Sequence, residues 1–226
     1  MPAEISVVIP TLNAGAELPG CLEALFEGLQ AGLIRELILS DGGSCDQTIA
    51  IAESAGARIV VGSASRGGQL RRGCEKARGN WLLILHADTR LEPGWAEEVT
   101  EQIERRPSSP AHFRLAFRAK GIAPAWVAGW ANLRSSLFSL PYGDQGLLVP
   151  RRLYDEAGGY PDQPLMEDVA LIRALPRCQR LNAKARTSFA RYEQAGWMRR
   201  GCRNLWTLMR YFGGADPNSL AERYRR

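Results

Sequence analysis

Trp81-Leu82-Leu83-Ile84-Leu85 is the most hydrophobic strand-like run in the chain, and the polar residues His86 and Asp88 follow it directly. A short, continuously apolar run predicts a strand that is buried on both faces of a sheet. Similar runs cover residues 5–9, 36–40 and 58–61, and helical patterns cover residues 13–29, 47–55, 68–77 and 94–105. This alternation predicts an α/β fold with a central, mostly parallel sheet flanked by helices.

The alternation ends near Arg106, where the turn-rich segment 107–110 begins. Beyond it we expect strands at residues 112–118 and 146–149 and a helix at residues 166–175. In parallel sheets ligands bind at the carboxyl ends of the strands. The segments in which to look for a site are therefore 10–13, 41–46, 62–68 and 86–89.

The composition suits a globular protein with a sizeable core, since 45% of the 226 residues are hydrophobic and 23% are charged. The net charge of +5 is compatible with nucleic acid, an anionic membrane or an anionic substrate and selects none of them. A nucleic-acid module is disfavoured because the basic residues are dispersed and no aromatic residues are interleaved with them.

The cysteines and the N-terminus favour a cytoplasmic protein. The five cysteines are widely spaced, without a CxxC or Cys/His metal spacing, which predicts reduced and mostly buried side chains. Met1-Pro2-Ala3-Glu4 leads straight into a strand, without a basic and apolar signal segment. No apolar run approaches the ~20 residues of a membrane-spanning helix.

Two acidic residues follow predicted strands. Asp41 precedes Gly42 and Gly43, so the backbone can approach a ligand while the carboxylate accepts hydrogen bonds from a ribose or a base. The alternative is a turn that Asp41 caps. Asp88 can hold a hard divalent cation that also binds diphosphate oxygens, or it can cap the turn that follows the strand.

Two further segments carry charge at predicted helix starts. Residues 66–73 combine arginines and glycines, which suits a diphosphate at a helix N-terminus, although a solvated basic face is the alternative. Glu167 and Asp168 are adjacent carboxylates, one of which could act as a general base. The alternative is that the helix macrodipole alone favours acids there.

In order along the chain, these motifs resemble the inverting family-two glycosyltransferases of the GT-A fold. The resemblance covers roughly residues 4–192 and rests on five motifs, which are residues 7–13, 40–48, Arg66-Gly67 with Gln69 and Gly73, 86–88, and 167–168. The chain resembles most closely a small bacterial subgroup with Leu-His-Ala-Asp at residues 85–88 and Tyr-Gly-Asp-Gln at residues 142–145. Members of this subgroup are labelled arsenosugar-biosynthesis glycosyltransferases.

The resemblance implies a role for each matching position. The donor, a nucleotide-sugar, would be bound by Pro10, Thr11, Asn13, Asp41, Arg66, Gly67, Ala87 and Arg191. Asp88, with His86 beside it, would bind Mg²⁺ or Mn²⁺. Asp168 would be the catalytic base and Glu167 a supporting or alternative carboxylate. Residues 1–106 would form the nucleotide-sugar-binding half, residues 107–192 the acceptor half, and residues 193–226 a helical tail.

Two departures from the family pattern qualify these roles. His86 replaces the first acid of the usual Asp-x-Asp motif, so metal binding rests mainly on Asp88. Residues 187–192 lack the glutamine that opens the longer relatives' Gln-x-x-Arg-Trp, which favours single sugar transfer over polymer synthesis. The expected activity is metal-dependent, inverting transfer of one sugar. The alternatives are a sugar nucleotidyltransferase and a non-catalytic nucleotide-sugar-binding protein of the same fold.

In the tail, the spacing of apolar residues and arginines predicts a basic amphipathic helix over residues 197–212. Met198, Cys202, Leu205, Met209 and Phe212 fall on one stripe, with arginines beside it. Such a helix can lie on the inner face of the cell membrane, which would suit a lipid-linked acceptor, or it can pack on the domain or on a second subunit as a homodimer contact. The acceptor stays open between a lipid-linked compound and a small metabolite.

Overall fold

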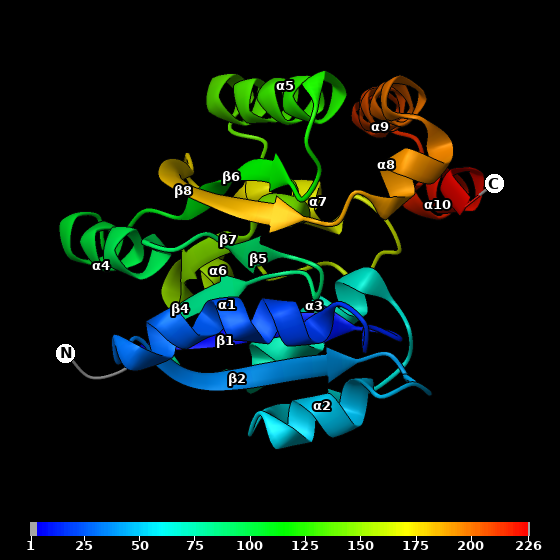
Figure 1. Cartoon of the computed structure of the whole chain (residues 1–226). Coiled ribbons are helices and arrows are strands. Elements are labelled where there is room, and N and C mark those ends of the chain that lie inside the picture. The colour runs from blue at the N-terminus through cyan, green and yellow to red at the C-terminus, as the bar shows by residue number, and fades with distance from the viewer. Residues whose placement is uncertain (1–3, 226) are drawn as a thin grey trace.

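The structure is a computed structural model that describes residues 4–225, without the side chains of residues 191, 194 and 225. The prediction that the chain lacks a signal segment concerns mainly residues 1–3, which lie outside the described residues. Within residues 4–225, eight strands form one sheet in the order β3-β2-β1-β4-β7-β6-β8-β5 (Figure 1). The strands are β1 (Ile5–Thr11), β2 (Ile34–Asp41), β3 (Arg58–Val61), β4 (Trp81–Ile84), β5 (Arg90–Leu91), β6 (Ala111–Phe117), β7 (Leu147–Pro150) and β8 (Gln179–Thr187).

Helices cover both faces of this sheet. They are α1 (Leu18–Gln30), α2 (Thr48–Ser54), α3 (Arg66–Lys76), α4 (Trp95–Arg105), α5 (Ile122–Phe138), α6 (Arg151–Glu156), α7 (Glu167–Ala174), α8 (Ala190–Ala195), α9 (Trp197–Phe212) and α10 (Pro217–Arg225), with a 3-10 turn η1 at Gly143–Gln145. On β1, Val7 packs in the cluster that contains α1 and α4 side chains, while Val8 packs in the cluster that contains α3, α6 and α7 side chains. The predicted burial of this strand on both faces is confirmed.

The N-terminal half has the predicted topology. Strands β1, β2, β3 and β4 pair only in parallel with one another, and their carboxyl ends meet at one edge. The helix expected from Asn13 begins at Leu18 instead. Asn13 adopts a left-handed φ of 51°, and its backbone N–H donates to Ser44 Oγ at 2.8 Å. Pro19, in the first turn, fits a helix start and not a helix interior.

The C-terminal half mixes strand directions. Strand β7 runs antiparallel to β4 and to β6, whereas β6 and β8 are parallel. The strands expected at residues 112–118 and 146–149 and the helices at 166–175 and 197–212 are confirmed within one to two residues. Strand β8 and helix α5 were not predicted, because the polar sequence of β8 and the weak periodicity of α5 give no clear pattern.

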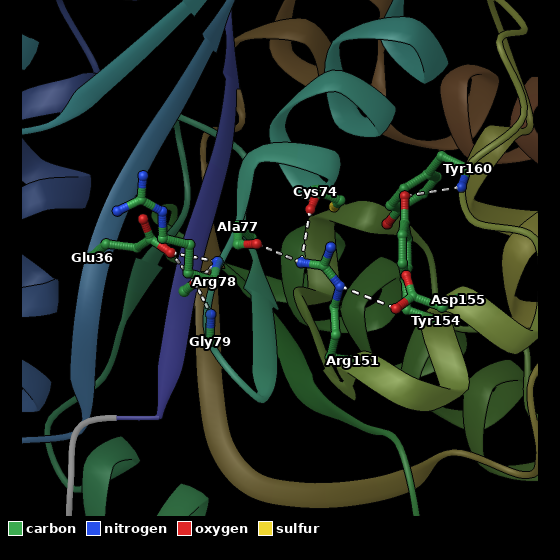
Figure 2. A network of polar contacts seen from close by, with 10 residues as sticks. Glu36, Cys74, Ala77, Arg78, Gly79, Arg151, Tyr154, Asp155 and Tyr160 are labelled. Carbon is green, nitrogen blue, oxygen red and sulfur yellow. Dashed lines mark hydrogen bonds and ion pairs between the residues drawn. The ribbon is translucent and has the colours of Figure 1, made fainter.

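The C-terminus of α3 is fixed by Arg151, at the start of α6 (Figure 2). The guanidinium Nη1 of Arg151 donates to the carbonyl oxygens of Cys74 at 3.0 Å and Ala77 at 2.8 Å in the last turn of the helix, where carbonyl groups lack the usual intrahelical donors. Its Nε donates to Asp155 at 3.2 Å. Because α3 begins at Arg66, on the edge where the strands end, this anchor sets the position of a predicted site residue from the opposite end of the helix.

We expect Arg151→Met to lower the free energy of unfolding by about 1–3 kcal/mol, since the partly buried carbonyl groups of Cys74 and Ala77 both lose a side-chain donor. Chemical denaturation monitored by circular dichroism measures the change. The matched control is Arg152→Met on the same helix, whose side chain is 70% exposed in a surface ion pair with Glu156, and it should change stability little. Equal losses in the two variants would contradict the anchoring role.

Candidate active site

The candidate site lies where β1, β2 and β4 end. Thr11 pairs with Asp41 at the last register position of β1 and β2, and residues 86–88 follow β4 directly. Strand β7 runs the opposite way, with Leu147 opposite Ile84, so the segment before β7 returns to the same edge. The antiparallel pairing therefore brings the 3-10 turn η1 beside residues 86–88.

Side chains from distant segments line one pocket at this edge. Its polar wall contains the predicted residues Arg66, His86, Asp88, Glu167 and Asp168. Tyr192, which with Arg191 was expected to help hold the diphosphate, also lines the pocket, as do side chains to which no role was assigned from the sequence, namely Tyr142, Asp144, Arg200, Asn204 and Tyr224. The structure thus brings together the residues expected to bind metal and those expected to act on the acceptor.

A second hollow shares Arg66, Arg200 and Tyr224 with this pocket and extends toward Leu12 and Gln69. Gln69 is buried, and its amide donates to the carbonyl oxygens of Thr11 at 2.7 Å and Ser40 at 3.1 Å. These bonds tie α3 to the ends of β1 and β2. The two hollows together form a groove from the first two strand ends to the carboxylates.

The Asp41 carboxylate holds its own loop. It accepts hydrogen bonds from the hydroxyls of Thr11 and Ser44 and from the backbone N–H groups of Gly43 and Ser44, at 2.6–2.9 Å. These hydrogen bonds hold the pKa of Asp41 below its ordinary value, against the effect of burial. Asn13 joins the two loops, since its side chain accepts from the backbone N–H of Cys45 at 2.9 Å. The loops expected to hold the nucleotide are therefore rigidly connected.

Arg66 and Glu167 form an ion pair with 3.1 Å between Nε and Oε1. The Glu167 side chain is 2% exposed, whereas that of Arg66 is 43% exposed and reaches the pocket. Gly67, the next residue, has no room for a side chain, because a Cβ there would collide with the backbone carbonyl of Pro161. The first turn of α3 thus packs directly on the loop that leads to Glu167.

Gly143 brings Asp168 and His86 close together. Its backbone N–H donates to Asp168 Oδ2 at 3.0 Å. A Cβ at Gly143 would lie 2.5 Å from both Asp168 Oδ2 and His86 Nε2, so only glycine allows this approach. Met166, just before α7, has a left-handed φ of 63°, a conformation that costs energy in a non-glycine residue and is frequent at functional sites.

The pocket concentrates buried negative charge. Burial, together with the charges of Asp168 and Asp88, raises the pKa of Asp144 to about 6, against the effect of Arg134. Burial also raises the pKa of Asp168, against the effects of Arg66 and the Gly143 N–H. Burial and the neighbouring Asp168 raise the pKa of Glu167. A cation in the pocket would remove this repulsion.

The donor set fits a divalent metal. Asp144 Oδ1 and Asp168 Oδ1 are buried and accept no hydrogen bond from the described residues. Carboxylate oxygens are the ligands that Mg²⁺ and Mn²⁺ prefer. Within residues 4–225, however, no three His, Cys, Asp or Glu side chains converge closely enough to hold an ion by themselves. A metal here would need further oxygen ligands from a bound diphosphate or from water.

Some predicted residues lie elsewhere. Pro10 and Thr11 end β1, outside the carboxylate pocket, and the Ala87 side chain packs in the core cluster that includes β1 and α1. The Arg191 side chain is outside the described residues, although its neighbour Tyr192 lines the pocket. Asp144 was missed as a site residue even though it stands in the quoted Tyr-Gly-Asp-Gln motif, where a lone acid between glycine and glutamine was the available signal.

The cysteines agree with their prediction. All five are free, and Cys21, Cys74 and Cys178 are buried, whereas Cys45 and Cys202 are exposed. No helix within residues 4–225 is long and apolar enough to cross a membrane.

Comparison with protein families identifies the family of the chain. The family model described as "Glycosyl transferase family 2" matches residues 6–137, and these residues contain the first four motifs. The chain belongs to glycosyl transferase family 2. A relative of this family-2 chain in Mycobacterium bovis, named PGL/p-HBAD biosynthesis glycosyltransferase, is 32% identical over 164 residues. The alignment covers 69% of this chain but only 62% of the relative, so the chain spans less than two thirds of that protein's length.

Solved structures share the fold of the family-2 chain. Residues 1–349 of S. aureus TarS align with a TM-score of 0.63 at 15% identity, covering 91% of this chain and 64% of that one. Glucosyl-3-phosphoglycerate synthase from Mycobacterium tuberculosis, in complex with Mn²⁺, UDP and glucosyl-3-phosphoglycerate, aligns with a TM-score of 0.59 at 21% identity, covering 89% and 78%. At these identities the likeness concerns the fold alone, and it confirms the expected GT-A-type α/β architecture.

Proposed function

We propose that this family-2 chain is an inverting glycosyltransferase that moves one sugar from a nucleotide-sugar to an acceptor hydroxyl. The observation that carries the proposal is that Asp88 and Asp168 line the same pocket although 80 positions separate them in sequence. A carboxylate after β4 can bind the donor's metal and diphosphate, and a carboxylate on α7 can activate the acceptor. The groove toward Leu12 and Gln69 offers a place for the nucleoside.

In the proposed reaction, Asp168 accepts the proton of the acceptor hydroxyl while that oxygen attacks the anomeric carbon of the donor. The bond between this carbon and the diphosphate oxygen breaks, and the single displacement inverts the anomeric configuration. Burial raises the pKa of Asp168 and so strengthens it as a base. The Gly143 N–H orients its Oδ2, which leaves Oδ1 for the acceptor. Arg66 contributes positive charge beside the leaving diphosphate.

A divalent cation, Mg²⁺ or Mn²⁺, is part of this proposal. Asp88 would hold it, with His86 as a ligand or as a neighbour that orients Asp88, and the bound ion would neutralise charge on the leaving diphosphate. Support comes from the unpartnered carboxylate oxygen Oδ1 of Asp144 and from the Mn²⁺ in the mycobacterial synthase complex. The proposal also keeps the donor-binding role that the family resemblance implied for Thr11, Asn13, Asp41, Gly67 and the other predicted donor residues.

The acceptor is open between a lipid-linked compound and a small metabolite. The narrower assignment to the arsenosugar subgroup rests only on the motifs at residues 85–88 and 142–145. We retain as proposals the division into residues 1–106, 107–192 and 193–226 and a location at the cytoplasmic face of a membrane.

A thermal-shift screen tests donor binding. We expect a UDP-sugar, among UDP-, GDP-, dTDP- and ADP-sugars, to raise the melting temperature only when Mn²⁺ is present. UDP is favoured because it is the nucleotide bound in the solved TarS and mycobacterial synthase complexes. At a concentration 100-fold above Kd the stabilisation is about 2.7 kcal/mol, which corresponds to a shift of about 5 °C or more. If no sugar nucleotide shifted the melting temperature with or without Mn²⁺, the proposed function would be wrong.

A further inference from the structure

Two neighbouring helices, α5 and α9, carry apolar stripes that the rest of the described chain leaves exposed. They contact each other on the side of the molecule where β6 and β8 lie, at the top of Figure 1. The stripe of α5 consists of Ile122, Trp126, Trp130, Leu133 and Leu137, each at least 48% exposed. The rings of Trp126 and Trp130 stack with 6.5 Å between centroids. The opposite side of α5 packs on β6 through small residues such as Ala128 and Ala131.

Helix α9 faces the protein mainly with polar side chains, together with the apolar Leu208 and Trp197. The buried or half-buried positions include Arg200, Asn204 and Thr207, and the first two line the candidate active-site pocket. The stripe of α9 consists of Met198, Leu205, Trp206, Met209 and Phe212, each at least 42% exposed. A helix that packs on its own domain normally turns its apolar stripe inward. The orientation of α9 is the reverse, so this stripe is available to something outside the domain.

The charges beside the stripes select the occupant. Neither helix contains an aspartate or a glutamate, whereas α9 carries Arg199 and Arg210 beside its stripe. Arg173 adds a further positive charge, with its guanidinium 5.2 Å from the ring centre of Phe212. In a two-fold dimer formed through these helices, the same basic face would meet itself, and like charges would repel. An anionic lipid surface complements both the arginines and the tryptophans, whose amphipathic rings favour the headgroup region.

We propose that the stripes of α5 and α9 together form a docking surface for a bilayer that contains anionic lipid. The helices lie in the interface, with the tryptophans among the headgroups and the arginines near lipid phosphates. Because Arg200 and Asn204 line the pocket from the other side of α9, docking places the pocket next to the bilayer. The evidence for this surface is the exposure of its side chains and their charge, so the docking proposal does not depend on the proposed reaction.

Vesicle co-sedimentation of the full-length chain tests the surface, with vesicles of phosphatidylcholine alone or with 40% phosphatidylglycerol (~100 nm in diameter). We expect binding to the mixed vesicles and little binding to phosphatidylcholine alone, with a marked loss at high salt. Trp206→Ser/Met209→Ser and Trp126→Ser/Trp130→Ser should each lower the partition coefficient by about tenfold or more. The matched control is Phe26→Ser/Leu29→Ser on α1, where two side chains of similar exposure, each 56%, are replaced outside the surface.

Circular dichroism of each variant separates loss of binding from loss of folding, since all replaced side chains are at least half exposed. The proposal is overturned if the wild-type chain fails to sediment with the mixed vesicles, or if the α5 and α9 variants bind as well as the control. Sedimentation velocity identifies the competing occupant. A wild-type dimer that Trp206→Ser/Met209→Ser converts to a monomer, without vesicle binding by either, would assign the surface to a second copy.

Discussion

Replacing Asp168 by asparagine is expected to lower the rate of sugar transfer by about 10²–10⁴-fold, because the acceptor hydroxyl loses its general base. Asparagine has nearly the same shape, and its Oδ1 can still accept the hydrogen bond from the Gly143 N–H. The substitution also removes one negative charge from beside Glu167 and Asp144, so the fold should be at least as stable as that of the wild type. Donor binding should be retained. Steady-state transfer rates and donor titrations measure the two effects separately.

Glu167→Gln is the matched variant for this experiment. Glutamine can keep a contact with Arg66 while losing the ion pair, so we expect a smaller loss of activity accompanied by weaker donor binding. A variant of Asp168 that transfers sugar at the wild-type rate would refute its role as the base. If Glu167→Gln alone abolished transfer with donor binding intact, the role would pass to Glu167.

The N-terminal half of the fold could be predicted because its sequence pattern and its structure obey the same rule. Strands β1, β2 and β4 have apolar residues at successive positions, and β1, β4 and the second half of β2 are buried on both faces, as in a covered parallel sheet. The direction of β7 could not be predicted, since a four-residue apolar run is identical in parallel and antiparallel pairing. Strand β8 was missed because polar residues such as Arg180 and Lys184 hide its pattern.

The candidate site likewise contains some residues that could be predicted from the sequence and others that could not. Their places at a strand end and a helix start made Asp88 and Asp168 only candidates, the resemblance to the family selected them, and both line one pocket in the structure. Asp144 reaches that pocket only because β7 reverses direction beside β4, which is a tertiary fact. Arg200 and Tyr224 reach it because α9 and α10 fold back over the domain, whereas the stripe pattern of α9 says only that one face is apolar and not which way it turns.

Asp88→Asn is expected to lower sugar transfer by about 10²-fold or more and to abolish the Mn²⁺-dependent part of UDP binding. The neutral amide is a poor ligand for a hard divalent cation, and the other carboxylates of the pocket do not by themselves form a cluster of three that could hold the ion within residues 4–225. Titration calorimetry of Mn²⁺ in the presence of UDP measures the loss. Glu156→Gln is the control, since this α6 side chain is 57% exposed in a surface ion pair with Arg152, and it should leave both quantities unchanged.

His86→Ala tests the role of His86 in the proposed metal site, where an imidazole takes the place of the first carboxylate of the usual motif. If His86 is a ligand, its loss weakens Mn²⁺ binding in the presence of UDP about as much as the loss of Asp88. If His86 only orients its neighbours beside Gly143, Mn²⁺ affinity is retained and transfer alone falls. Mn²⁺ binding that survives in Asp88→Asn would remove the metal from this position altogether, because Asp88 is the residue on which the assignment depends.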